Sequence, residues 1–263
     1  MKHSHRRENG LIIINAVTLI IMLTTNSLAN ILPINGVTTG QVSAAYRNLF
    51  TPAGFTFGIW GLIYLLLLAQ FIYLLVARIK GSENKILAKV GTILPFIHAI
   101  NASWLLAWHH QLMGFSWLLI VMLLILLWQA NEKLRRTVSG TSSYLFGKLP
   151  IRVYLGWIVV ATFANTAVLL TKWNVPGEIY WAPFFALLVV GVAALFIVYR
   201  KDLAVPLTII WALTGIYYGN LARQDEGNEI MRWFAIAGMG IALLSILFIQ
   251  VQKATNSSSQ KGF

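Results

Sequence analysis

The chain alternates long apolar stretches with short polar gaps, and this alternation limits its fold more than any other feature. A charged side chain at the centre of a bilayer costs about 3 kcal/mol or more, and backbone groups without hydrogen bonds are also costly there. The apolar stretches contain no acidic residue. All acidic side chains lie in the gaps or near the N-terminus: Glu8, Glu83, Glu132, Glu178, Asp202, Asp225, Glu226 and Glu229. The sequence therefore predicts an all-α polytopic helix bundle in a membrane.

Composition supports the membrane assignment and excludes several classes of function. Of the 263 residues, 58% are hydrophobic and only 11% are charged, whereas soluble proteins carry about 25% charged residues. The net charge of +12 would suggest nucleic acid as a partner of a soluble protein. Here the basic residues form short clusters between apolar stretches, so we predict no nucleic-acid partner. The absence of cysteine excludes disulfides and thiolate chemistry.

A helix needs about 20 apolar residues to cross a bilayer. The apolar stretches predict eight transmembrane helices, at residues 11–32, 56–76, 89–108, 115–129, 151–171, 179–199, 203–221 and 233–251. The first of these resembles a signal peptide, with a basic start and a weak cleavage site at Ala29. We favour a retained first helix because the apolar stretch continues to Leu32 and is long enough to span.

The distribution of lysine and arginine predicts the orientation. With the N-terminus in the cytoplasm, the cytoplasmic segments of an eight-helix topology hold 16 of the 20 basic residues, and the outer loops hold 4. This agrees with the positive-inside rule. Adding or removing one helix would exchange the sides of all later loops and remove this uneven distribution of basic residues. We expect both termini in the cytoplasm of a cell whose sharp charge bias suits a bacterial cytoplasmic membrane.

Three predicted helices carry a stripe that mixes aromatic rings with hydrogen-bonding groups. Side chains three or four residues apart lie on one face of a helix, and asparagine in a membrane normally faces the bundle interior. The stripes lie on the second, third and fifth predicted helices: Phe57, Trp60 and Tyr64; His98, Asn101, Trp104 and Trp108; and Tyr154, Trp157, Ala161 and Asn165.

Two interpretations of the stripes stay open at this point. In one, the asparagines join helices and the stripes are only packing surfaces. In the other, they line a cavity with apolar walls and a few polar anchors, suited to a flat hydrophobic ligand. The long outer loop at residues 33–55 is either a lid for such a cavity or a plain connection.

Individual polar and aromatic residues lead to further expectations. His98 is a candidate haem ligand or proton carrier, with an ordinary buried hydrogen bond as the alternative. His109 and His110 are expected at a loop, in contact with water or headgroups, and Arg152 is expected to extend toward water from a helix start. Tryptophans near helix ends are expected in the interfacial belt: Trp108, Trp128, Trp173, Trp181 and Trp233. No metal site is predicted.

Residues 50–58 (FTPAGFTFG), followed by Trp60 and Tyr64, resemble the hallmark motif of the TspO/MBR family of tryptophan-rich sensory proteins, which are related to the mitochondrial translocator protein. Residues 101–104 (NASW) are similar to the family's N-x-x-W motif. Leu149 and Pro150, with Trp157 and Asn165 further on, are similar to its fifth-helix motif. The resemblance covers about residues 10–172. Ala53 and Phe55 replace a proline and a tryptophan of the hallmark, one residue is missing between Gly58 and Trp60, and three predicted helices follow the five of the family. These differences indicate a lengthened, divergent member.

The resemblance implies a five-helix core at residues 1–172, with three additional helices and a polar tail at residues 173–263. It also implies a ligand of the porphyrin, haem or sterol type, with no certain cofactor. The residues that match the family motifs and would bind the ligand are Phe57, Trp60, Tyr64, Asn101, Trp104, Trp157 and Asn165.

The sequence therefore predicts a membrane sensor or regulator that binds a hydrophobic, planar small molecule. A transporter or permease is the alternative, although no predicted helix contains a charge pair for ion coupling. Enzymatic activity is less favoured, because no catalytic dyad or metal cluster is apparent. Expected partners are the bilayer and the small molecule. Small residues of the last helix, from Ala235 to Ala242, also allow a homodimer.

Overall fold

A computed structural model describes residues 2–82, 84–135, 140–221 and 226–259. Glu83, Arg136, Arg223, Asp225 and Lys261, which entered the charge analysis, lie outside the described residues. The described residues are helical, with no strand among them. Their contacts divide the chain into two compact units. Unit 1 comprises residues 1–46 and 57–169, and unit 2 comprises residues 47–56 and 170–263.

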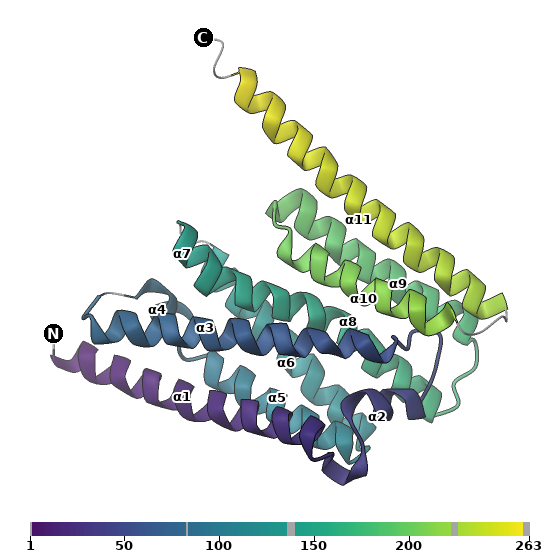
Figure 1. The fold of residues 1–263 in the computed structure, drawn as a ribbon, viewed down its shortest axis with the longest axis horizontal. Helices are drawn as coiled ribbons and strands as arrows, with labels where there is room; N and C mark the ends of the chain where they lie inside the picture. The colour runs from purple at the N-terminus through teal and green to yellow at the C-terminus, as the bar shows by residue number, and fades with distance from the viewer. Residues whose placement is uncertain (1, 83, 136–139, 222–225, 260–263) are drawn as a thin grey trace. The chain divides into compact units, whose positions relative to one another are not determined.

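Unit 1 is a bundle of long helices with short connecting elements (Figure 1). Its long helices are α1 (Lys2–Ile31), α3 (Ile59–Ile79), α5 (Leu94–His109), α6 (Met113–Arg135) and α8 (Leu149–Lys172, of which residues up to 169 belong to this unit). The short elements are η1 (Ile34–Gly36), α2 (Thr39–Ala45), α4 (Lys85–Val90), α7 (Thr141–Ser143) and the π-helical turn η3 (Tyr144–Lys148), which leads directly into α8. Unit 1 and unit 2 meet in sequence within the 3₁₀ turn η2 (Gly54–Gly58).

Local sequence explains where the short helices begin. The Thr38 hydroxyl accepts from the Gln41 backbone N–H while the Gln41 side chain accepts from the Thr38 N–H, a capping box that starts α2. The Asn84 side chain accepts from the N–H groups of Ile86 and Leu87 and starts α4 in the same way. These caps fix the chain just outside the long apolar helices.

Interhelical hydrogen bonds give the directions of the helices in unit 1. Asn15 of α1 bonds the carbonyl of Gly91, which lies just before α5. Further along both segments, Asn26 of α1 bonds Asn101 of α5. Because the partners rise together in number, α1 and α5 run parallel. Between α6 and α8 the partners run in opposite order, since Ser116 bonds Asn165 while Arg152 bonds Asn131. The core of the unit therefore lies between helices whose directions alternate along the chain.

Unit 2 contains the C-terminal helices and the segment at residues 47–56. Its helices are α9 (Glu178–Leu195), which continues into the π-helical turn η4 (Phe196–Arg200), α10 (Ala204–Leu221) and α11 (Glu226–Ser259), and these three helices pack against one another. A Cβ atom at Gly238 of α11 would lie 2.6 Å from Val190 Cγ2 of α9 and 3.1 Å from Leu213 Cδ1 of α10. Small residues of α11 thus permit close helix approach within this chain; the homodimer stays a prediction.

Seven helices among the described residues are long and apolar enough to cross a membrane, instead of the predicted eight. The difference is the predicted helix at residues 89–108. A turn at residues 91–93 divides that stretch into α4 and α5, and α5 has only 16 residues. By contrast, the fourth predicted helix, the shortest by sequence, extends over the 23 residues of α6.

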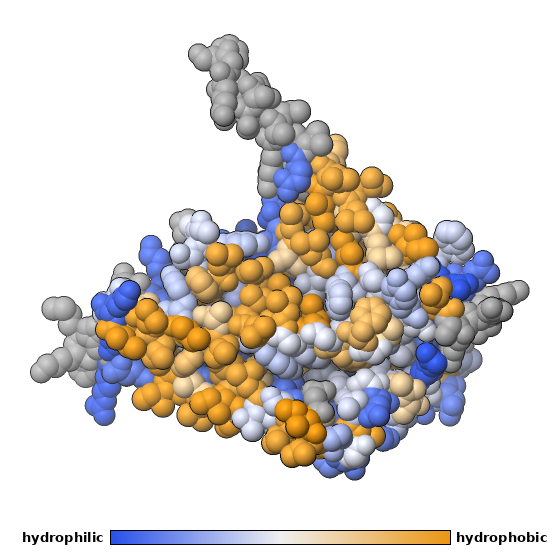
Figure 2. All heavy atoms as spheres, in the orientation of Figure 1, coloured by the Kyte–Doolittle hydropathy of each residue, from blue (hydrophilic) through white to orange (hydrophobic). Residues whose placement is uncertain are grey.

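The side chains that the helices expose are mostly apolar along their lengths. In unit 1 these include Ile20 of α1 and Leu65 of α3, and in unit 2 they include Leu244 of α11. Figure 2 shows apolar side chains over the N-terminal helices and along α11, with hydrophilic side chains gathered toward helix ends. Apolar surface of this extent is stable in lipid. The chain is therefore an integral membrane protein.

Candidate functional site

Trp60 is the centre of a buried group of aromatic rings in unit 1. Its ring is stacked with Tyr64 one turn along α3, at 5.6 Å between ring centroids. It also contacts Trp104 of α5 at 5.7 Å, and Tyr154 and Trp157 of α8 at 5.8 and 6.0 Å. Phe57 joins the group through Trp157, at 6.1 Å. We call these six residues (Phe57, Trp60, Tyr64, Trp104, Tyr154 and Trp157) the aromatic cluster.

The contacts within the aromatic cluster have the geometry that aromatic rings prefer. Trp60 meets Tyr154 and Trp157 edge to face, with interplanar angles of 74° and 81°. Centroid distances of about 4.5–7 Å in edge-to-face or offset-stacked arrangements are each favourable by about 0.5–1.5 kcal/mol beyond burial. The indole rings of Trp60, Trp104 and Trp157 are all buried, with 3–7% of their surface exposed. The three predicted stripes thus face one another in the interior.

A chain of hydrogen bonds crosses the bundle beside the aromatic cluster. The Tyr64 hydroxyl donates to Asn26 Oδ1, and Asn26 Nδ2 donates to Asn101 Oδ1 at 2.8 Å. Asn101 Nδ2 then donates to the Tyr154 hydroxyl at 2.6 Å. The chain joins α3, α1, α5 and α8 in turn. We call these four residues the buried polar network.

Asn165 forms a second polar junction. Its Oδ1 accepts from Trp104 Nε1 at 3.3 Å and from Ser116 Oγ at 3.0 Å, while its Nδ2 donates to the Ala161 carbonyl at 2.9 Å. Asn165 and Ser116 are both buried. Both asparagines of the predicted site therefore form hydrogen bonds between helices, as the packing interpretation expects. Their binding of a ligand stays a prediction.

One buried polar atom of the aromatic cluster has no hydrogen-bond partner in the structure. The Nε1–H of Trp157 is buried, and the structure gives it no acceptor. The indole N–H of Trp104, by contrast, has Asn165 as its acceptor. A buried donor without an acceptor costs about 1–3 kcal/mol, so natural structures rarely keep one without a reason.

The structure brings all seven sequence-predicted site residues together in unit 1. Sequence reasoning missed Asn26 and Ser116, and it placed Tyr154 in a stripe without naming it as a site residue. Asn26 carried a usable signal, since it is a carboxamide in the middle of an apolar stretch and faces the same penalty as Asn101. Ser116 carried no clear signal, because serine is tolerated on many faces of a membrane helix.

The histidines differ from part of the prediction. His98 Nδ1 lies 3.2 Å from the Thr18 hydroxyl, so the hydrogen-bonded alternative is the arrangement present. His109 was expected in contact with water, and this was wrong, because it is fully buried beneath the outer loop. Its Nε2 lies 3.0 Å from the Thr39 hydroxyl and its Nδ1 lies 3.2 Å from the Ile34 carbonyl oxygen. His110 is exposed, as expected.

Further bonds hold the outer loop of unit 1 to the end of α5. Trp108 Nε1 donates to the Thr39 carbonyl at 3.1 Å, and Asn35 Nδ2 donates to the His109 carbonyl at 3.0 Å. Trp108 is buried, so its assignment to the interfacial belt was wrong; it is covered by α2 instead of lipid. Trp173 and Trp233 are exposed, as a position in the belt requires. The first part of the loop, residues 33–46, thus has a regular structure and is hydrogen-bonded to the end of α5.

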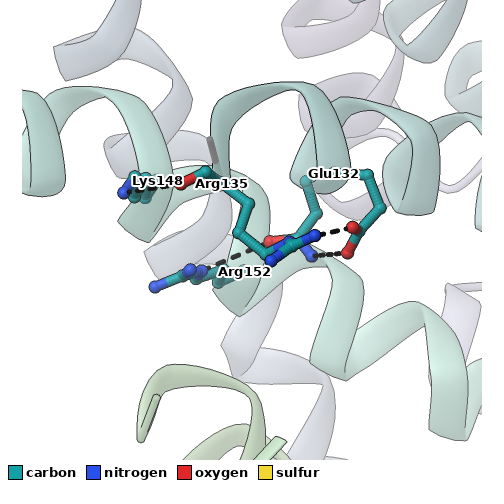
Figure 3. Close-up of polar contacts among 5 residues, drawn as sticks. Glu132, Arg135, Lys148 and Arg152 are labelled. Atoms are coloured by element: carbon teal, nitrogen blue, oxygen red, sulfur yellow. Dashed lines mark hydrogen bonds and ion pairs between the residues drawn. The ribbon is translucent and has the colours of Figure 1, made fainter. Parts of the chain in front are cut away.

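Arg152 also departs from the prediction, because it is buried and does not extend into water. Figure 3 shows it in a group of polar side chains where α6 ends and α8 begins. Arg152 Nε donates to Asn131 Oδ1 at 3.2 Å, and its guanidinium lies 5.8 Å from the centre of the Tyr144 ring. Nearby, Arg135 pairs with Glu132 at 3.0 Å. These contacts fix the cytoplasmic end predicted for the α6–α8 pair.

No group of three or more histidine, cysteine, aspartate or glutamate side chains with a spacing suited to a metal occurs among the described residues. The family model of the TSPO-like proteins matches residues 12–248 of the chain. The match includes α9, α10 and most of α11, which the motif resemblance did not cover. Comparison with curated proteins and with solved structures finds no match.

Proposed function

We propose that this chain, which belongs to the TSPO-like protein family, binds a planar hydrophobic small molecule at the aromatic cluster and acts as a sensor or regulator in the membrane. The residues of the proposed site are Phe57, Trp60, Tyr64, Asn101, Trp104, Trp157 and Asn165. Stacked and edge-to-face indoles offer π surfaces for a flat ligand. Tetrapyrroles and sterols are the ligand classes that the family resemblance implies.

The observation that carries the proposal is the unpartnered N–H of Trp157. The Tyr64 and Tyr154 hydroxyls and the Trp104 N–H of the same cluster are hydrogen-bonded within the chain, whereas the buried Trp157 N–H is a donor of fixed direction without an acceptor. Ligand sites of this kind have apolar walls and a few placed polar groups that fix orientation. A ligand oxygen or nitrogen that accepts from Trp157 would remove the cost of the unmet hydrogen bond. We infer that the ligand combines a flat apolar body with at least one acceptor.

Replacing single tryptophans tests this inference. Trp157→Phe removes the unmet donor, which should stabilise the ligand-free protein by up to about 1–3 kcal/mol. The smaller ring also loses packing contacts, which offsets part of this gain, so the variant should be as stable as the wild type or more stable. The same variant should bind protoporphyrin more weakly, by roughly tenfold if one hydrogen bond of about 1.4 kcal/mol is lost. Binding is followed by quenching of the remaining tryptophan fluorescence.

Trp104→Phe is the matched control, because it makes the same chemical change at an indole whose N–H is already bonded to Asn165. It should lower stability in the absence of ligand. Equal affinities in the wild type and in Trp157→Phe would refute the role of the Trp157 donor. Unchanged quenching after replacement of both Trp60 and Trp157 by phenylalanine would refute the site itself. Uptake of the probe by reconstituted vesicles would favour the transporter alternative.

We also propose that α5 is an eighth crossing, with both termini in the cytoplasm of a bacterial cell. Hydrogen bonds join Asn15 of α1 to Gly91 and Asn35, which follows α1 in η1, to His109. The 16 residues of α5 rise by about 24 Å at 1.5 Å per residue, and the turn at residues 91–93 extends this segment toward the hydrocarbon thickness of about 30 Å. An α5 that follows α1 over this length reaches the same depths.

Cysteine labelling tests this topology, because the chain has no cysteine of its own. Ser82→Cys and His110→Cys change exposed residues at the two ends of the α4–α5 region. A membrane-impermeant maleimide applied to intact cells should label position 110 and should label position 82 only after lysis. Labelling of both positions from the same side would show that α5 does not cross.

A further inference from the structure

The segment at residues 49–56, which includes most of the hallmark motif, is bound by the C-terminal helices of unit 2. Ala53 N–H donates to the carbonyl oxygen of Gly215 in α10 at 2.8 Å. Asn220 Nδ2 donates to the Leu49 carbonyl at 2.9 Å, and Trp211 Nε1 donates to the Thr56 carbonyl at 3.0 Å. Residues of α10 thus bond one backbone group at each end of the segment and one at its centre.

Side chains of unit 2 complete the binding of this segment. Phe55 meets the rings of Trp211 and Tyr218 edge to face, at 5.6 and 5.8 Å. Phe50 is fully buried and meets Phe185 of α9 at 6.0 Å. The Leu49 N–H also donates to the carboxylate of Glu178, at the start of α9. The segment is thus held at both of its ends and at its centre.

Two glycines of α10, four residues apart, allow the segment to approach the helix backbone. A Cβ atom at Gly215 would lie 2.0 Å from Thr56 Oγ1 and 2.5 Å from its Cγ2. A Cβ atom at Gly219 would lie 2.3 Å from the carbonyl oxygen of Thr51. Small residues at this spacing let another chain segment lie directly on a membrane helix. Here they form a groove for the segment at residues 49–56.

The position of this segment affects the proposed site through the covalent chain. Thr56 is the last residue of the segment, and Phe57 of the aromatic cluster follows it directly. Trp60 lies in the first turn of α3, which begins at Ile59. The Thr56 carbonyl that Trp211 bonds belongs to the peptide group that leads directly into Phe57. A binding site needs such support, because a displacement of about 0.5 Å is enough to impair it.

We propose that Gly215, Gly219, Trp211 and Asn220 of α10 are positioning residues for the site: the C-terminal helices hold the segment at residues 49–56 and thereby set the first turn of α3. This gives the additional helices a role in ligand affinity without any contact with the ligand. The effect on affinity depends on the function proposed above, whereas the effect on the start of α3 does not.

The test uses Gly215→Ala and Gly219→Ala in the full-length protein, with Gly191→Ala in α9 and Gly240→Ala in α11 as matched controls. An added Cβ meets nothing within 4 Å at either control position, so the controls share the gain in helix propensity without the clash. Each variant is measured twice, by protoporphyrin titration and by amide hydrogen exchange in the absence of ligand.

The Gly215→Ala and Gly219→Ala variants should exchange faster at residues 49–56 and in the first turn of α3, and should bind protoporphyrin roughly tenfold more weakly. The controls should match the wild type in both measurements. Faster exchange at residues 49–56 with an unchanged α3 and unchanged affinity would overturn the positioning role. Wild-type exchange at residues 49–56 in both variants would overturn the groove itself.

A second-site variant and a milder variant distinguish the proposed positioning effect from a general loss of folding. Thr56→Gly removes the atoms that an alanine at position 215 would strike, so Thr56→Gly with Gly215→Ala should recover the affinity lost in Gly215→Ala alone. Failure of this recovery would overturn the proposal. Trp211→Phe removes the bond to the Thr56 carbonyl and reduces the ring that meets Phe55, and it should show the same changes to a smaller degree. The exposed Trp233→Phe is its control.

If wild-type protein does not bind the probe, the proposed function fails. The exchange measurement still decides whether α10 sets the start of α3, because it needs no ligand. Unchanged exchange at the first turn of α3 in Gly215→Ala would then overturn the positioning role by itself.

Discussion

Replacing Asn101 by leucine should destabilise the bundle by an amount that its hydrogen bonds predict. Asn101 is fully buried, accepts from Asn26 Nδ2 at 2.8 Å and donates to the Tyr154 hydroxyl at 2.6 Å. Leucine has nearly the same size, so the change removes polar groups and leaves packing almost intact. It also leaves a donor on Asn26 and an acceptor on Tyr154 without these partners.

The expected magnitude comes from the two lost bonds. Hydrogen bonds between membrane helices contribute about 0.6 kcal/mol on average and about 1.7 kcal/mol at most. Asn101→Leu should therefore lower the free energy of unfolding by about 1–3 kcal/mol. Tyr154→Phe removes one of the two bonds and should cost about half as much. In the double variant the shared bond is lost only once, so the two effects should fall short of additivity by about 0.6–1.7 kcal/mol.

Reversible unfolding in bicelles measures these differences, with circular dichroism as the readout. Ser103→Leu is the control, because Ser103 lies on the exposed side of the same helix. The control should leave stability unchanged or raise it slightly. Asn101→Leu within about 0.3 kcal/mol of the wild type, or full additivity with Tyr154→Phe, would refute the network as a source of stability.

Two further predictions concern the outer loop and α11. Because His109 Nε2 lies 3.0 Å from the Thr39 hydroxyl and His109 Nδ1 lies 3.2 Å from the Ile34 carbonyl oxygen, His109→Ala should loosen the outer loop and speed amide exchange of α2. Unchanged exchange of α2 in this variant would refute the role of these contacts. Gly238→Leu should cost about 1–3 kcal/mol by overpacking against Val190, whereas Gly240→Leu should be neutral in thermal unfolding; equal effects would refute the assigned helix face.

Spacing along single helices was sufficient to identify the aromatic cluster. Phe57, Trp60 and Tyr64 had to share a face because of the 3.6-residue period, and Asn101 had to turn inward because lipid offers it no partner. The same reasoning applied to Asn26 would have placed it in the buried polar network. Which stripe meets which, and through which atoms, depends on helix order in space, and a one-dimensional pattern does not contain that order.

The errors have a common physical cause. His109 and Trp108 were judged by their distance from a helix end, which sets depth in the membrane but not what covers the surface there. Residues 33–46 fold back over them, and the bonds from Thr39 and Asn35 show why this cover is stable. The length of α5 was misjudged because the turn at residues 91–93 interrupts an apolar stretch without changing its hydropathy.

The sequence by itself determined the membrane environment, the helical class and the inward direction of the aromatic and carboxamide side chains, because the penalty for a polar group in lipid acts on each residue separately. Only the tertiary structure decided that the Trp157 N–H is left without a partner and that α10 receives the segment at residues 49–56 on Gly215 and Gly219. Both facts depend on contacts between residues far apart in the chain, where packing geometry, and not composition, selects the partner.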